Sequence, residues 1–317
     1  MGSCRLMSAG NLREIIERVV SCGRCPAACA RGIAHTRLHQ AGLVAEGEWL
    51  VPVAKVPWLN ANGIREDLRS RGMNPAGLEV VACSESTNAR MIKRAERQSI
   101  AGEVMLAESQ VSGRGRRGRE WFSPLGLSLS ISMGMSVSLS ADRFGLASLA
   151  VGVAIAETLE SMGVDCARVN WPNDVEVDGA KMAGVLVELV HPEDAPELVV
   201  GFGINTGGAA LLRRWLARPV TDVSEHLSGD VRHELAVGAI VSVNRLISEL
   251  EGGGLDSVIA RWRRRDALEG KSVEVRTSSE TIQGIAAGID ACGALLLHRQ
   301  GRLERLVGGE VSVRSIG

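Results

Sequence analysis

The sequence has few aromatic residues and no long apolar run. Its aromatic residues are six Trp and three Phe, with no Tyr, so the core must consist mainly of Val, Leu, Ile and Ala. No uninterrupted apolar stretch reaches the ~18 residues of a membrane span. The longest candidate, Phe144–Ala156, is shorter and contains Ser148 and two glycines. The first fifteen residues lack the apolar segment of a signal peptide. These absences predict a cytoplasmic protein with no membrane segment.

Charge and cysteine content exclude further classes. Lys plus Arg number 36 and Asp plus Glu 37, for a formal net charge of −1. This balance excludes a globally basic nucleic-acid binder, although a local basic patch stays open. Seven Cys form an odd set that is not typical of a disulfide scaffold. We therefore expect reduced thiols.

The chain divides into three parts by pattern, and we predict an α+β fold. Residues 1–78 are rich in Cys and contain one clear helical pattern, Leu12–Val20, so we expect an N-terminal helical appendage. Residues 79–267 mix strand and helix patterns and predict a mixed sheet flanked by helices. Residues 268–317 hold only short β-type runs separated by turns, which is typical of a small β-barrel.

The most informative segment is residues 113–119 (GRGRRGR). Its four Arg repel one another and its three Gly make the loop costly to order. A bound anion would offset both effects, because guanidinium groups grip carboxylate and phosphate oxygens and Gly lets backbone N–H groups approach closely. A solvated basic loop or an RNA-binding tract is the alternative. Trp121, just after the loop, is a candidate platform for a purine, or else a core residue.

Two further segments carry polar residues at strand ends. In residues 169–174 (VNWPND) an apolar strand runs into Trp-Pro and then Asn173 and Asp174. The hairpin beyond turns at Asp178-Gly179 and returns with Lys181, which we expect to point toward the Arg loop; a surface lysine is the alternative. The third segment, residues 201–205 (GFGIN), is a Gly-punctuated strand end.

These segments together resemble the biotin protein ligases. Residues 86–88 (STN), 113–121 (GRGRRGREW), 170–174 (NWPND) followed by 181–188 (KMAGVLVE), and 201–205 (GFGIN) have the order and approximate spacing of that family. The resemblance covers roughly residues 80 to 315. It implies a class II synthetase-like catalytic domain and an SH3-like C-terminal β-barrel. It also implies an ATP-dependent ligase that forms biotinyl-5′-AMP and transfers biotin to a lysine of a biotin carboxyl carrier protein or domain.

The resemblance assigns site residues and cofactors as well. It implies that Arg114, Arg116 and Lys181 supply positive charge and that Asp174 orients or deprotonates the acceptor amine. The implied biotin-binding residues are Ser86, Thr87, Gln110, Gly113, Arg114 and Gly184. The implied nucleotide-binding residues are Arg116, Arg119, Trp121, Asn173 and Asn205. ATP would be used with Mg²⁺ on its phosphates.

One position departs from the family pattern. The family usually has Lys where this chain has Asn170, which removes a positive charge from the strand leading into the NWPND segment. We expect Arg168, two residues earlier on the same strand face, to replace part of that charge.

The N-terminal part supports a separate hypothesis. Cys22, Cys25 and Cys29 are clustered, with His35 and His39 nearby, and this spacing indicates a Zn²⁺ site or an iron–sulfur cluster. The alternative is that the thiols simply fill a small domain. Some family members begin with a winged helix-turn-helix. We can trace no recognition helix followed by a β-wing here, so DNA is not an expected partner.

Two other functions stay open. The first is a lipoate or other acyl-protein ligase of the same fold. The second is a non-catalytic regulator that binds nucleotide or nucleic acid through the Arg loop; the near-neutral charge and the presence of Lys181 with Asp174 speak against it. The sequence leaves the oligomeric state open, with a homodimer among the alternatives.

Overall fold

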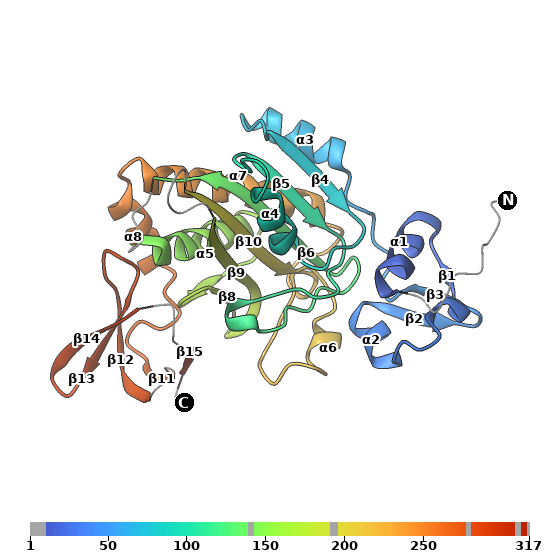
Figure 1. Cartoon of the computed structure of the whole chain (residues 1–317). Helices are drawn as coiled ribbons and strands as arrows, with labels where there is room; N and C mark the ends of the chain where they lie inside the picture. The colour runs from blue at the N-terminus through green and yellow to red at the C-terminus, as the bar shows by residue number, and fades with distance from the viewer. Residues whose placement is uncertain (1–10, 139–142, 191–195, 277–279, 308–311, 316–317) are drawn as a thin grey trace.

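Three sheets follow one another along the chain in the computed structural model, which describes residues 11–138, 143–190, 196–276, 280–307 and 312–315. Figure 1 shows a small N-terminal region at one end, a large central sheet flanked by helices, and a C-terminal sheet on the side away from the N-terminal region. This is the predicted α+β fold.

The N-terminal region contains strands as well as helices. Its elements, in chain order, are α1 (Leu12–Cys22), β1 (Cys25–Pro26), η1 (Ala27–Ala30), α2 (His35–Gln40), β2 (Leu43–Glu46) and β3 (Trp49–Pro52). The predicted first helix is confirmed: Asn11 caps its start by accepting a hydrogen bond from Arg13 N, and Gly23 ends it in the left-handed conformation, φ 75°.

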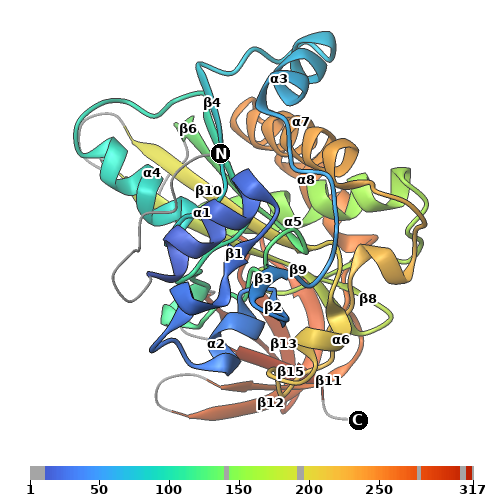
Figure 2. The same cartoon turned by 90° about the vertical axis from the view of Figure 1, so that its right-hand side faces the viewer.

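A three-stranded sheet of order β1-β3-β2 completes this region, so the expected helical appendage is instead a small α/β region. A helix followed by a β-hairpin is also present, as α2 and then β2–β3, which has the element order of a winged helix-turn-helix (Figure 2). The sequence pattern missed it because the two strands have four residues each, too few for a period of two to stand out.

The N-terminal region packs onto the central one. Its small core, which includes Ile16 and Leu43, also contains Cys83 and Leu125 from the central region. The backbone N–H of Leu125 donates a hydrogen bond to the carbonyl of Ala41 at 2.9 Å. These contacts fix the N-terminal region against the loops that follow the strands of the central sheet.

The central sheet has seven strands in the order β4-β5-β6-β10-β9-β8-β7, with β4 and β5 parallel and all other neighbours antiparallel. The strands are β4 (Gly77–Val81), β5 (Glu103–Ala107), β6 (Ser128–Ser136), β7 (Arg168–Asn170), β8 (Asp174–Val177), β9 (Ala180–Val190) and β10 (Glu197–Asn205). The predicted hairpin is β8–β9, with both turn residues, Asp178 and Gly179, at positive φ.

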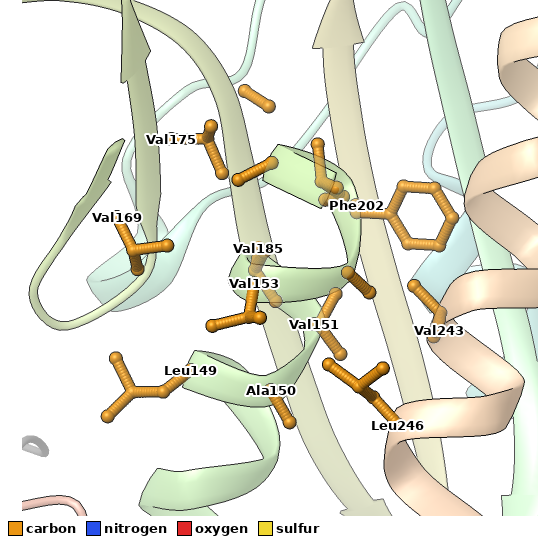
Figure 3. Packing of buried hydrophobic residues seen from close by; sticks show 14 of the residues in the cluster. Leu149, Ala150, Val151, Val153, Val169, Val175, Val185, Phe202, Val243 and Leu246 are labelled. Carbon is orange, nitrogen blue, oxygen red and sulfur yellow. The ribbon is translucent and has the colours of Figure 1, made fainter. Parts of the chain in front are cut away.

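The two faces of this sheet differ because the strands alternate. On one face large apolar side chains pack against α5 (Phe144–Ser161), α7 (Arg232–Glu251) and α8 (Leu255–Arg263). Figure 3 shows Val185 and Phe202 from the strands beside Val151 of α5 and Val243 of α7. On the other face, α4 (Thr87–Ala95) packs over β5, β6 and β10 on an apolar cluster that includes Met105 and Val199, and the rest of the face carries serine and glycine. The remainder of that face is left open for a site.

Helix α3 (Ala61–Ser70) belongs by packing to the central region. Its Ile64 and Leu68 are fully buried in the same core as α7. The domain division at residue 78 stays a prediction, and this packing favours an earlier boundary.

The C-terminal part forms one antiparallel sheet of order β14-β13-β12-β11-β15. Its strands are β11 (Ser272–Arg276), β12 (Thr281–Ile289), β13 (Leu295–Arg299), β14 (Arg302–Leu306) and β15 (Ser312–Ser315). The small β domain is thereby confirmed as a sheet; a β14–β15 pair, which would close it into a barrel, is not among the pairings of the described strands.

Helix α5 is long and apolar enough, by length and composition alone, to cross a membrane. However, 67% of its apolar window is buried inside the molecule between the sheet and α7. It has the character of a core helix.

Candidate active site

A cavity of about 400 Å³ lies on the serine- and glycine-bearing face of the central sheet. Residues 114–116 of the Arg loop and residues 119–122 after it form part of its wall. The predicted site residues that line it are Ser86, Thr87, Gln110, Arg114, Arg116, Arg119, Trp121, Asn173, Asp174, Lys181, Gly184 and Asn205. The fold therefore gathers residues that are more than 100 positions apart in the sequence.

The sheet supplies a floor of small side chains. Gly184 of β9 and Gly201 and Gly203 of β10 face the cavity, while the apolar residues between them face the core. A Cβ at Gly201 would stand 1.9 Å from Asn88 Oδ1, and one at Gly203 would stand 2.4 Å from the Trp121 indole. Only glycine lets these side chains lie directly on the sheet.

One part of the cavity wall is a network of neutral polar side chains, of which Asn88 also donates to the carboxylate of Glu188 at 2.8 Å. Ser86 caps α4 through its hydroxyl, and the next residue, Thr87, donates its backbone N–H to Gln110 Oε1 at 2.7 Å. Gln110 Nε2 donates to Ser130 Oγ at 3.1 Å. Ser132 Oγ lies 2.7 Å from Thr87 Oγ1 and 2.6 Å from Asn88 Oδ1. Such a cluster suits a ligand that offers both donors and acceptors.

The Arg loop forms a short turn, η2 (Arg116–Gly118), closed by a hydrogen bond from Gly115 N to Arg119 O at 2.7 Å. Arg117 adopts the left-handed conformation, φ 58°. Burial, together with the charge of Arg117, lowers the pKa of Arg116. The loop thus holds guanidinium groups close together at the cavity, where an anion would relieve their mutual repulsion.

Gly113 does not line this cavity. A Cβ there would stand 2.4 Å from the carbonyl oxygen of Trp121 and 3.1 Å from Gln110 Nε2. The absence of a side chain at Gly113 lets the two ends of the loop pack closely together. A direct contact between Gly113 and biotin stays a prediction.

A cluster of ions lines another part of the cavity wall. Lys181 Nζ lies 2.5 Å from Asp174 Oδ1, and Arg218 Nη2 lies 2.9 Å from Asp174 Oδ2. Burial acts to raise the pKa of Asp174, but Lys181 and Arg218 outweigh it and the net pKa shift is downward. Burial also lowers the pKa of Lys181, against the opposing effect of Asp174. Asp174 is therefore ionised, between two cations.

Trp121 lies over the glycine floor rather than in the core. Its ring is beside Gly203 and Gly184, and Lys181 Nζ is 5.4 Å from the ring centroid. Its indole Nε1 is buried without a hydrogen-bond partner among the described residues. The residue is thus placed to form a wall of the cavity next to the reactive cations.

The two asparagines predicted to contact nucleotide also brace the site. Asn173 Nδ2 donates to the carbonyl of Val185 at 2.7 Å, and Asn205 Nδ2 donates to the carbonyl of Thr221 at 3.1 Å. Their amide groups tie the strand ends to neighbouring backbone, and any contact with nucleotide stays a prediction.

The charge expected from Arg168 is supplied elsewhere. Arg168 is exposed, and Asn170 uses its amide to donate to Glu176 Oε1 at 2.7 Å. The arginine that contacts the carboxylates of Asp174 and Glu176 is Arg218, which the sequence analysis did not identify. No motif marks Arg218, because it lies in the irregular segment after α6 (Ala209–Leu212).

The cysteine cluster does not form a metal centre. Cys25 is buried in the small N-terminal core, Cys22 is exposed and Cys29 is half-buried. Across the described ranges no group of three or more His, Cys, Asp or Glu is placed to hold a metal ion. The interpretation of Cys22, Cys25 and Cys29 as a zinc or iron–sulfur site is therefore wrong, and packing by small side chains accounts for Cys25.

Comparison with known proteins agrees with this geometry. The profile of the Biotin/lipoate A/B protein ligase family matches residues 80–205, and that of the Biotin protein ligase C terminal domain matches residues 270–314. The Bifunctional ligase/repressor BirA of Salmonella typhimurium is 36% identical over 259 residues, covering 81% of this chain and 79% of that protein. The Biotin--[acetyl-CoA-carboxylase] ligase of Mycobacterium tuberculosis is 31% identical over 272 residues, covering 80% and 96%.

A solved structure shares the fold. The biotin protein ligase from Aquifex aeolicus in complex with biotin and ATP superposes with a TM-score of 0.65 at 23% identity, covering 77% of this chain and 99% of that one. The chain belongs to the biotin/lipoate A/B protein ligase family. Within that family its C-terminal domain and its relatives place it among the biotin protein ligases.

Proposed function

We propose that this protein is an ATP-dependent ligase that forms biotinyl-5′-AMP and transfers biotin to a lysine of a biotin carboxyl carrier domain. The observation that carries the proposal is that one cavity is lined both by the neutral side chains of Thr87, Asn88 and Gln110 and by Arg116, Lys181 and Asp174. Such a cavity accommodates a neutral ring system joined to a charged, reacting end.

In the first step a carboxylate oxygen of biotin attacks the α-phosphorus of ATP. The bond between that phosphorus and the bridging oxygen breaks, and pyrophosphate leaves with the electron pair. Two anions must approach each other for this reaction, so fixed cations lower the barrier. The cations that line the cavity are Arg114, Arg116, Arg119, Lys181 and Arg218. Of these we assign Arg114, Arg116 and Lys181 to this step.

Mg²⁺ would accompany ATP and neutralise its phosphates. The acidic residue at the reacting end, Asp174, already contacts both Lys181 and Arg218. The donor set in the described part of the chain thus does not fit a protein-held metal, and we assign this chain no metal ligand.

In the second step the neutral amine of the acceptor lysine attacks the acyl carbon of the adenylate. A C–N bond forms, the bond from the acyl carbon to the phosphate oxygen breaks, and AMP leaves with the electron pair. The amine nitrogen loses a proton, and we propose that Asp174, which lines the cavity, orients the amine or accepts that proton. A second cavity of about 650 Å³ shares Asp174 and lies toward the C-terminal domain, where Lys271 lines it. It offers the acceptor lysine a route to Asp174.

The neutral network favours biotin over lipoate. Thr87, Asn88 and Gln110 present buried or half-buried donors and acceptors that a ureido ring satisfies. These groups already hydrogen-bond to one another and to neighbouring serines, and a dithiolane ring, which has no N–H donor, could add no hydrogen bond to their oxygens. We therefore expect strong discrimination against lipoate.

The N-terminal region is proposed to support the ligase rather than to bind DNA. Arg37 of α2 lines a cavity of about 360 Å³ together with Arg114 and Trp121, so this helix faces the Arg loop. The turn of the β2–β3 hairpin carries Glu46 and Glu48, both exposed, which would repel the phosphate backbone of DNA. A cytoplasmic location and a homodimeric state stay predictions.

The deciding experiment incubates the protein with ATP, Mg²⁺, biotin and a purified biotin carboxyl carrier domain, followed by a streptavidin blot. We expect biotinylation of one acceptor lysine, abolished by replacing that lysine with arginine. A parallel reaction with lipoate should give no product. Labelling by lipoate in preference to biotin would favour the alternative ligase, and biotin-independent binding of nucleotide alone would favour a regulator.

A further inference from the structure

Arg218 occupies a position between two buried carboxylates. Its Nη2 lies 2.9 Å from Asp174 Oδ2 and 3.8 Å from Glu176 Oε1. The side chains of Asp174 and Glu176 are 16% and 14% exposed, and that of Arg218 is 38% exposed. The arginine therefore reaches from the surface into the site and holds both acids from one side.

The two carboxylates are close because strand β8 places them two residues apart, on one face of the sheet. Like charges on neighbouring side chains raise the free-energy cost of ionising either carboxyl group. On the neighbouring strand β7, Asn170 gives Glu176 only a neutral amide donor. Of the two acids, Lys181 on β9 forms an ion pair only with Asp174. Arg116 of the Arg loop also interacts electrostatically with Asp174. Arg218 is thus the one cation of the described residues that forms ion pairs with both acids.

Lys181 must serve two partners during the proposed reaction. In the structure its ammonium group is 2.5 Å from Asp174 Oδ1. To bind a carboxylate or phosphate oxygen, it must turn part of its charge away from Asp174. A buried carboxylate that loses its only counter-charge is strongly destabilised, which would keep Lys181 in place. Because Arg218 holds the second oxygen, Asp174 stays paired when Lys181 turns to the ligand.

We propose that Arg218 is a positioning residue of the ligase: it holds Asp174 ionised and oriented through Oδ2, so that Lys181 is free to contact the reacting acyl phosphate. It takes over the electrostatic task left open by the neutral Asn170. This inference rests on the proposed function for its kinetic consequences, whereas the pairing of Arg218 with Asp174 does not depend on it.

The test compares Arg218→Ala, Arg218→Lys and Arg218→Ala/Asn170→Lys in biotin-dependent ATP–pyrophosphate exchange across pH. We expect Arg218→Ala to lower kcat by about tenfold or more, with a smaller change in the KM for biotin, and to move the acid limb of the rate profile to higher pH. The groups that face Asp174 in that titration are Lys181, Glu176, Arg116 and Arg218. Arg218→Lys should recover part of the rate. Asn170→Lys should do so as well, because residue 170 is the register partner of Asp174 and contacts Glu176.

The control variant is Arg214→Ala, an exposed arginine on the same segment, which should behave as wild type. Wild-type kcat and pH profile in Arg218→Ala would overturn the proposal. Loss of activity that neither lysine variant restores, together with a lower melting temperature, would assign Arg218 a purely structural role and overturn it as well.

A carboxyl NMR titration separates this inference from the proposed function. Removing Arg218 should raise the pKa of Asp174 measured in the ligand-free protein. An unchanged pKa would refute the pairing even if biotinylation is observed. Conversely, a raised pKa with no biotin-dependent exchange in the wild type would leave the pairing intact and reject the ligase reaction.

Discussion

Replacing Lys181 with alanine removes the most buried cation at the reacting end of the cavity, where its side chain is 15% exposed. Loss of one preorganised group that stabilises developing charge typically costs about 10²–10³ in rate, or about 2.7–4 kcal/mol. We therefore expect Lys181→Ala to slow adenylate formation by at least about a hundredfold. The reason is that the remaining cations at the cavity are all arginines more exposed than Lys181 or, in the case of Arg218, paired with Asp174.

The effect of the same change on stability should be small. Breaking a buried ion pair by removing one partner costs about 3–5 kcal/mol when the other charge is left alone. Asp174 is not left alone, because Arg218 remains 2.9 Å from Oδ2. Burying Lys181 also has a desolvation cost that the variant no longer bears. We expect a loss of about 1 kcal/mol, or a melting temperature about 2–4 °C lower.

Biotin-dependent ATP–pyrophosphate exchange measures the first effect and thermal unfolding the second. The matched control is Lys93→Ala, at an exposed lysine on α4, which should change neither the exchange rate nor the melting temperature. An exchange rate within about threefold of wild type in Lys181→Ala would refute the assignment of Lys181. A fall in melting temperature large enough to unfold the protein would instead show that Arg218 does not compensate.

Three further predictions follow from particular contacts. Gly203→Ala places a Cβ 2.4 Å from the Trp121 indole, so we expect calorimetry to show biotin binding weakened by more than about tenfold. The control is Gly77→Ala, where a Cβ meets ordinary van der Waals contacts, and its biotin affinity should equal that of the wild type. Arg232 and Glu108 form an ion pair in which the side chains are 4% and 2% exposed. Arg232→Met removes one partner, so urea unfolding should show a free energy of unfolding lower by about 3–5 kcal/mol. Arg245→Met breaks an exposed ion pair and should lower that free energy by less than about 1 kcal/mol. Burial raises the pKa of Asp266 to about 6, so its native form keeps a proton that the unfolded chain releases near pH 4. The free energy of unfolding should therefore fall by up to about 3 kcal/mol as pH rises from about 4 to about 6, and Asp266→Asn should remove that fall; an unchanged slope would contradict the assignment.

The long periodic elements were predictable from the sequence. Apolar residues at helical spacing over residues 146–162 indicate α5, and alternation with a period of two over residues 127–137 indicates β6, because both elements are long enough for a period to be detected. The hairpin turn at Asp178-Gly179 was equally clear, since few residues tolerate two successive positive φ angles. The short strands β2 and β3 were missed because four residues leave almost no period to detect.

The site was predictable where it depends on residue types in a fixed local order. The Arg loop, the segment with Asn173 and Asp174, and Lys181 all meet at one cavity. Arg218 was not predictable, because nothing in its own neighbourhood in the sequence distinguishes it from a surface residue. The cysteine cluster failed for the opposite reason: its spacing is suggestive, but the fold turns Cys25 inward and leaves Cys22 exposed.

By itself the sequence determined which segments carry charge, which segments alternate apolar and polar residues, and where the chain forms turns, because these properties depend on residues that are neighbours in the sequence. The tertiary structure alone decided which side chains share an electrostatic environment. Arg218 and Asp174 are 44 positions apart, yet the ion pair between them sets the charge at the reacting end of the cavity. The physical reason is that Coulomb attraction and desolvation depend on distance and burial in space, and chain separation carries no information about either.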